Sequence, residues 1–72
     1  MHYNNIIEQL KARRESLQVT QVMLADLSSV SLRALKQFES GKGNPTLETL
    51  SKLADALGME VNLQVKTPKL DP

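Results

Sequence analysis

The sequence predicts an all-α domain of about four short helices followed by one β-strand. Three observations lead to this expectation. Apolar residues recur at helical spacing over most of the chain. Residues that favour helix N-caps precede several of these stretches. From residue 59 onward the spacing changes to strict alternation, which is typical of a strand. The 72 residues are expected to form one domain at residues 1–66, with residues 67–72 as a flexible tail.

The first two helices are expected at residues 5–16 and 21–28. Asn5 and Glu8 have the spacing of a capping pair. The apolar stripe of the first helix consists of Ile6, Ile7, Leu10 and Leu17. Thr20 is a suitable N-cap for the second helix. The second helix is expected to bury Leu24, Ala25 and Leu27.

The third helix is expected to begin at its N-cap, Ser31, and to end near Ser40, with Leu35 and Phe38 on its inner face. Gly41 is expected to end it, and residues 41–45 have the composition of a loop. A fourth helix would follow the N-cap Thr46 and end at Gly58. Its apolar stripe consists of Leu47, Leu50, Leu53, Ala54 and Leu57.

Residues 59–66 are expected to form a half-buried strand. Its apolar face consists of Met59, Val61, Leu63 and Val65. A single strand in a helical domain has no internal partner for its backbone N–H and C=O groups. We therefore expect it to pair with the same strand of a second copy, antiparallel across a two-fold axis.

The second and third helices, with about three residues between them, have helix-turn-helix spacing. On a helical wheel, the outward face of the third helix carries Arg33, Lys36, Gln37 and Ser40, with Leu32 at its margin. Cations contact phosphates, arginine matches the acceptors of guanine, glutamine matches adenine, and an apolar side chain packs on the thymine methyl. The net charge is only +1, but this region of the chain is locally basic.

Residues 20–58, "TQVMLADLSSVSLRALKQFESGKGNPTLETLSKLADALG", resemble the Cro/C1-type (lambda-repressor-like) helix-turn-helix family. The matching elements are Thr20-Gln21, Leu24-Ala25, Val30-Ser31, Leu35, Phe38-Glu39, Gly41, Asn44-Pro45, Leu50, Leu53-Ala54 and Leu57-Gly58. The resemblance covers roughly residues 6–58. It implies a compact bundle of four to five helices that binds DNA sequence-specifically as a dimer.

Carried over to this chain, the resemblance also implies roles for individual residues. Base contacts would come from Ser31, Leu32, Arg33 and Gln37. Phosphate contacts would come from Gln21, Lys36, Ser40 and Lys42. Arg14 and Glu39 would form a structural ion pair between the first and third helices. The chain departs from the family at Ser29, where glycine is frequent, and at Met23, where glutamate is frequent.

The strand that follows Gly58 resembles the HipB-type antitoxins, which are dimeric repressors of their own operons and bind a kinase-like toxin of the HipA type. The two resemblances imply a homodimer that binds a palindromic double-stranded DNA operator and acts as an autoregulating repressor and as the antitoxin of a toxin-antitoxin operon. We expect its location to be cytoplasmic. Two alternatives stay open. One is a stand-alone phage- or host-type repressor without a toxin partner. The other is a protein-binding module with secondary DNA binding, favoured by the apolar Val22 and Met23.

Catalysis, a cofactor and a metal site are not expected. The chain has no cysteine and a single histidine, His2, and the loop "GKGNP" lacks the P-loop spacing. Such a small domain also offers little room for a catalytic cleft. The sequence starts without a basic region followed by an apolar run, and no apolar run reaches the length of a membrane span.

Overall fold

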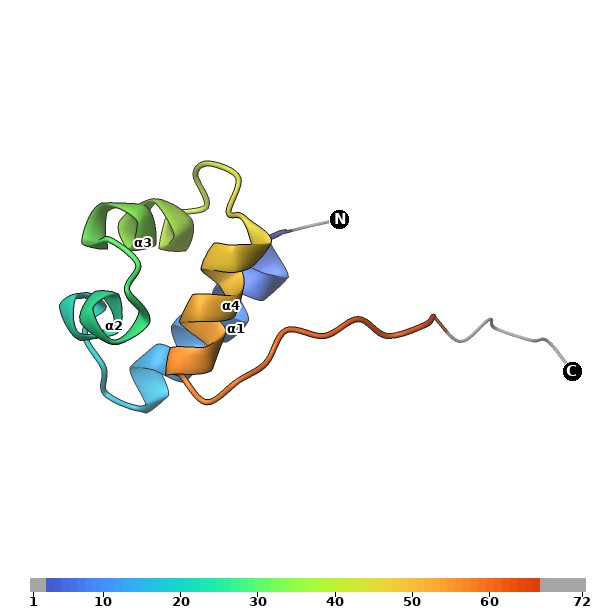
Figure 1. Cartoon of the computed structure of the whole chain (residues 1–72), viewed down its shortest axis with the longest axis horizontal. Helices are drawn as coiled ribbons and strands as arrows, with labels where there is room; N and C mark the ends of the chain where they lie inside the picture. The colour runs from blue at the N-terminus through green and yellow to red at the C-terminus, as the bar shows by residue number, and fades with distance from the viewer. Residues whose placement is uncertain (1–2, 67–72) are drawn as a thin grey trace, which may run out of the picture.

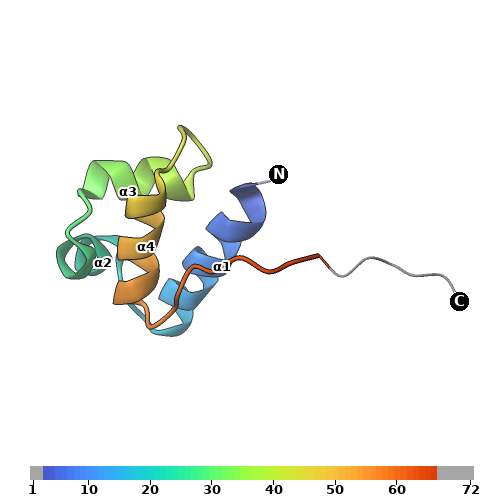
Figure 2. The same ribbon diagram turned by 45° about the vertical axis from the view of Figure 1, so that its right-hand side comes forward.

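Four α-helices make up the computed structural model, which describes residues 3–66. In chain order they are α1 (Tyr3–Ser16), α2 (Gln21–Ser28), α3 (Leu32–Glu39) and α4 (Leu47–Ala56). The expected all-α bundle is therefore confirmed, and α2 has the expected bounds. In both views, α2 and α3 lie on one side of the bundle, and residues 59–66 extend away on the other side (Figures 1 and 2). None of the helices in the described range has the length and apolar character needed to cross a membrane.

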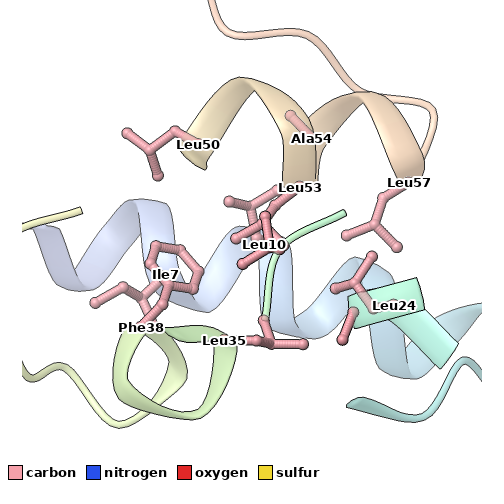
Figure 3. Close-up of a cluster of buried hydrophobic side chains, with 11 residues drawn as sticks. Ile7, Leu10, Leu24, Leu35, Phe38, Leu50, Leu53, Ala54 and Leu57 are labelled. Carbon is pink, nitrogen blue, oxygen red and sulfur yellow. The ribbon is translucent and has the colours of Figure 1, made fainter. Parts of the chain in front are cut away.

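All four helices contribute to one apolar core. The buried apolar residues are Ile7, Leu10, Leu24, Ala25, Val30, Leu35, Phe38, Leu50, Leu53, Ala54 and Leu57. Figure 3 shows these side chains pointing toward one another from the different helices. Leu35 and Leu53 are completely buried. The core holds α3 against α1 and α2, and α2 against α4, so it fixes the position of the helix that was expected to contact DNA.

Three hydroxyl side chains cap the helices as the sequence predicted. The side-chain oxygens of Thr20 and Ser31 each accept a hydrogen bond from a backbone N–H three residues later, at 3.1 Å in both cases. Thr46 does the same at 3.0 Å. These bonds satisfy N–H groups that have no partner inside their helix. The expected cap at Asn5 is wrong, because α1 already begins at Tyr3 and Asn5 lies inside the helix.

Three leucines that were expected in apolar stripes are exposed instead. Leu17 lies beyond the last residue of α1, in the turn that leads to α2. Leu27 is 64% exposed, because the inner face of α2 is formed by Leu24, Ala25 and Ser28. Leu47 is 68% exposed, because it lies in the first turn of α4, before the residues that are buried.

Residues 59–66 form no strand within the described part of the chain. Met59 stays close to the bundle, where its backbone N–H donates to the Ala54 carbonyl at 2.8 Å and its side chain is half-buried. Leu63 and Val65 are each 94% exposed. The half-buried strand is therefore absent from the single chain, and pairing with a second copy stays a prediction. His2 and the expected tail at residues 67–72 lie outside the described residues.

The turn after α2 contains a strained residue. Ser29, at the position where glycine is frequent in the family that the sequence resembles, has a φ of 62°, in the left-handed region. A Cβ atom in this region clashes with the following carbonyl oxygen. Ser29 is exposed, so nothing in the packing of the core requires its side chain.

Replacing Ser29 with glycine is expected to raise the free energy of unfolding by up to about 1 kcal/mol, because glycine adopts a positive φ without steric penalty. Urea unfolding followed by circular dichroism measures the change. Ser51→Gly is the matched control, because Ser51 is exposed in the interior of α4. Glycine at that position should lower stability by roughly 0.5 kcal/mol. Equal losses for the two variants would contradict strain at Ser29.

Candidate nucleic-acid interface

The turn between α2 and α3 is fixed by side chains on both sides of Ser29. The buried hydroxyl of Ser28 accepts a hydrogen bond from the Val30 N–H at 3.2 Å. Val30, between the two helices in the chain, is itself buried and belongs to the apolar core. Ser31 then caps α3. The direction of α3 relative to α2 is therefore set by local hydrogen bonds and by the core together.

The outward face of α3 carries four polar side chains at positions i, i+3, i+4 and i+7. These are Arg33, Lys36, Gln37 and Ser40, and all four are exposed. Leu35 and Phe38 on the opposite face are buried. An eight-residue helix is about 12 Å long, and the DNA major groove is about 12 Å wide and admits an α-helix. The face thus combines two cations, an amide and a hydroxyl on a helix of suitable size.

The first turn of α3 holds the other two residues that were predicted to contact bases. Ser31 is exposed, and its oxygen already accepts the Ala34 N–H. Its hydroxyl proton can still be donated to a ligand. Leu32 is half-buried and packs against the core, so only part of its surface is available to a thymine methyl. Base contacts by these residues and by Arg33 and Gln37 remain predictions.

Of the residues predicted to contact phosphates, Gln21 begins α2, Lys36 lies in the middle of α3, and Ser40 and Lys42 follow the end of α3. Lys42 is exposed in the loop after α3, next to Gly41, whose φ is +80°. A cleft of about 140 Å³ between the end of α3 and the start of α4 is lined by this lysine, Gln37 and Thr46, among others. Gln21 is half-buried at the start of α2. Phosphate contacts by Gln21, Lys36, Ser40 and Lys42 remain predictions.

The buried carboxylate of Glu39, on the inner side of α3, connects this helix to α1 and α2. Glu39 accepts two hydrogen bonds from the Arg14 guanidinium, at 2.7 and 3.0 Å, and one from the Gln21 amide at 3.0 Å. The Arg14 guanidinium also donates to the Val19 carbonyl at 2.8 Å. The two charged side chains are only 11% and 5% exposed. The hydrogen bonds to Glu39 raise the pKa of Arg14, against the opposing effect of burial, so the arginine stays charged.

Arg13 has a role that the sequence analysis missed. Its Nε donates to the Leu57 carbonyl at 3.0 Å, just beyond the end of α4. A cation at this position also interacts favourably with the partial negative charge at the C-terminal end of the helix. Gly58 follows with a φ of +71°, and the position of a Cβ atom there would lie 3.5 Å from the guanidinium of Arg13. The sequence offered one signal, a second arginine directly before Arg14, but its partner lies 44 positions away.

Within residues 3–66, no three His, Cys, Asp or Glu side chains gather as a metal site would require. The guanidinium of Arg14, whose pKa is raised, has the structural carboxylate of Glu39 as its partner. The polar groups of this region are therefore arranged to support a helix and to expose its outer face.

Comparison with known proteins identifies the arrangement. The profile of the HTH_3 family, described as helix-turn-helix, matches residues 10–63. The chain belongs to this helix-turn-helix family. The Cro/C1-type resemblance seen in the sequence is thereby confirmed.

Two phage repressors are among the helix-turn-helix relatives. The chain is 42% identical over 57 residues to the cryptic phage CTXphi transcriptional repressor RstR of Vibrio cholerae, covering 79% of this chain and 51% of that protein. It is 38% identical over 55 residues to the immunity repressor protein of Bacillus phage phi105, covering 76% of this chain and 38% of that protein. The chain thus spans about half, or less, of the length of these relatives.

A solved structure supports the same fold. The crystal structure of an HTH_3 family transcriptional regulator from Vibrio cholerae superimposes with a TM-score of 0.76 and 37% sequence identity. It covers 83% of this chain, which in turn spans 34% of that protein. Helix-turn-helix membership thus rests on both sequence and fold, whereas the HipB-like strand is not confirmed by these comparisons.

Replacing Glu39 with alanine is expected to lower the free energy of unfolding by about 3 kcal/mol, because it leaves the buried charge of Arg14 without its partner. Thermal and urea unfolding measure the loss. The matched control is Glu8→Ala, since Glu8 is exposed on α1, and its effect should stay within about 0.5 kcal/mol. A loss at Glu39 no larger than that of the control would show that the ion pair does not hold α3 in place.

Proposed function

We propose that this chain is a sequence-specific DNA-binding transcriptional regulator, and specifically a repressor. One observation carries the proposal. The helix that follows the turn of the helix-turn-helix, α3, has an exposed face with basic and amide side chains. Relatives that are named repressors share this part of the chain. A protein of this kind needs no catalytic group, since its effect comes from occupying DNA.

In this proposal, α3 enters the major groove with its outward face toward the bases. Arg33 pairs with guanine through its two parallel N–H donors, and Gln37 pairs with adenine through its amide. Ser31 donates its hydroxyl proton, and the exposed part of Leu32 packs on a thymine methyl. Each correct bidentate contact discriminates against the wrong base by about 1–3 kcal/mol.

Contacts to the sugar–phosphate backbone fix the register of α3 on the duplex. Lys36 and Lys42 supply charge, and Ser40 and Gln21 supply hydrogen bonds. One amide N–H of Gln21 is bound to Glu39, which leaves its second N–H for a phosphate. Gln21 would then connect the buried ion pair to the DNA backbone directly.

A homodimer would bind a palindromic operator with two half-sites about one helical turn, roughly 34 Å, apart. Residues 59–66 are the proposed dimerisation segment, with Met59, Val61, Leu63 and Val65 as its apolar residues. The exposure of Leu63 and Val65 supports this assignment. Large apolar side chains that alternate with polar ones along an extended segment usually have one face covered, and an uncovered one is open to pairing with another chain. The domain would then comprise residues 1–66.

The named relatives favour a stand-alone phage-type repressor over a HipB-like antitoxin, because both are phage repressors. The antitoxin role with a HipA-like kinase toxin rests on the alternation at residues 59–66 and on the apolar Val22 and Met23. A gene for a kinase-like protein next to this one, together with co-purification of the two products, would reverse this preference.

A second candidate function is binding to another protein through α2. Val22, Met23 and Leu27 are all exposed on this helix, and large apolar side chains gathered on a surface often mark an interaction site. They share one helix with Gln21, so a bound protein could also affect contact with DNA. This observation favours a protein-binding role that accompanies DNA binding rather than replacing it.

Replacing Arg33 with alanine is expected to relax base preference at one operator position and to weaken binding there by about 1–3 kcal/mol. Selection from random-sequence DNA at low salt, followed by fluorescence anisotropy on the selected site, measures both effects. Lys42→Ala should instead weaken binding to all sequences and reduce the slope of log K against log salt by about 1. Lys11→Ala is the control, because Lys11 is exposed on α1 and has no part in the proposed contacts, so binding should stay unchanged. Failure of the unaltered chain to select any preferred site would refute the proposed function.

Truncation after Gly58 is expected to convert the dimer into a monomer, because it removes the whole proposed dimerisation segment. Sedimentation equilibrium measures the change in mass, and circular dichroism shows whether the helices persist. Truncation after Lys66 is the matched control and should leave the dimer intact. A chain that ends at Gly58 and still sediments as a dimer would place the interface elsewhere.

A further inference from the structure

The sequence of residues 60–66 is chemically symmetric about its centre. Leu63 is flanked by two amides, Asn62 and Gln64. Outside them stand two valines, Val61 and Val65, and outside those stand opposite charges, Glu60 and Lys66. A segment that pairs antiparallel with its own copy about a two-fold axis places each residue opposite its mirror position. This symmetry therefore gives every position of the segment a compatible partner in a second copy.

The structure leaves the same segment available for pairing. Residues 60–66 make no backbone hydrogen bond within the part of the chain that is described. All seven residues are exposed, and both views show the segment extending past α1, away from α2 and α3 (Figures 1 and 2). Glu60, Val61, Asn62 and Gln64 line one side of an open groove of about 430 Å³, whose other side is formed by residues of α1 and α4. The segment is therefore open to a second strand.

We propose that two copies of this chain pair through residues 60–66 as antiparallel strands, with Leu63 of one copy opposite Leu63 of the other. This register also places Val61 opposite Val65 twice. It further places Glu60 opposite Lys66 twice, so that two ion pairs close the ends of the ribbon. Opposite charges and apolar pairs at directly facing positions both stabilise antiparallel strands. The proposal rests on the dimer that the proposed function requires, and it names the surface and the register of that dimer.

Other registers lose these pairs. Centring the ribbon on Asn62 brings Glu60 opposite Gln64 and requires Met59 to pair with Val65. Met59 is already engaged with the bundle, through its N–H bond to Ala54 and its half-buried side chain. Centring it on Gln64 brings Asn62 opposite Lys66. Glu60 would then face position 68, outside the segment, and would lose its pairing with Lys66. A register centred between two residues would instead place apolar residues opposite polar ones, so that the apolar side chains of the two strands would lie on opposite faces of the ribbon.

Single cysteines test the register in the full-length chain, which contains no cysteine of its own. The variants are Asn62→Cys, Leu63→Cys and Gln64→Cys, oxidised in a glutathione buffer and followed on non-reducing gels. Directly opposite residues have Cα atoms about 4.5–5.5 Å apart, which suits a disulfide, whereas positions offset by two residues lie about 7–8 Å apart. We expect the Leu63→Cys variant to cross-link at least ten times faster than the other two. Equal rates, or faster cross-linking at position 62 or 64, would overturn the register.

Charge exchange gives an independent measurement. Glu60→Lys and Lys66→Glu should each weaken the dimer roughly three- to tenfold at low salt, because like charges then face each other. The double variant restores opposite charges in the proposed register and should return the dimerisation constant to that of the unaltered chain. A double variant as weak as the sum of the two changes would overturn the pairing of Glu60 with Lys66.

The outcomes separate this proposal from the proposed function. Selection of a preferred DNA site together with a failed cross-link at position 63 would refute the register and leave the regulator standing. Efficient cross-linking at position 63 in a chain that selects no DNA site would support the dimer and refute the regulator.

Discussion

The placement of the exposed face of α3 depends on the hydrogen bonds to the buried carboxylate of Glu39. This carboxylate receives the guanidinium of Arg14 from α1 and the amide of Gln21 from α2, so one side chain of α3 is fixed to both neighbouring helices. Removing a carboxylate and a guanidinium from water is unfavourable, and only complete hydrogen bonding offsets it. No buried side-chain nitrogen or oxygen among the described residues lacks a partner. An apolar pair could stabilise the bundle equally well, but it would fix neither the rotation of α3 nor the position of the Gln21 amide.

This carboxylate lies on the same short helix as the exposed cations, one turn from Lys36 and almost two from Arg33. A helix of eight residues is marginal by itself, so its outer face is only as well placed as its inner face is packed. Leu35 and Phe38 pack α3 on the core, and the hydrogen bonds of Glu39 fix its orientation relative to α1 and α2. The position of this outer face is in this sense set by the core.

Much of the fold could be predicted from local sequence, because N-caps and helical spacing are local signals. Thr20, Ser31 and Thr46 cap helices where their neighbours in sequence indicated. The errors arose where burial depends on a distant partner. Leu27 and Leu47 fit apolar stripes, but the neighbouring helices do not extend over them. The candidate site was predictable to the same degree: the exposed positions on α3 follow from its period, whereas the partial burial of Leu32 and the bond from Arg13 to α4 depend on tertiary contacts.

The adjacent arginines at the end of α1 would influence how a dimer of the proposed kind is placed on DNA. Arg13 holds the carbonyl at the end of α4, from which residues 59–66 depart, and Arg14 holds Glu39 on α3. One turn of α1 is thus attached both to the origin of the proposed dimer segment and to the proposed reading helix. In a dimer built on that segment, α1 would fix the distance from the dimer segment to α3 in each copy. It would thereby set the spacing between the two α3 helices. Related chains could then change the number of base pairs between their half-sites by altering this turn, with every residue that faces the DNA left as it is.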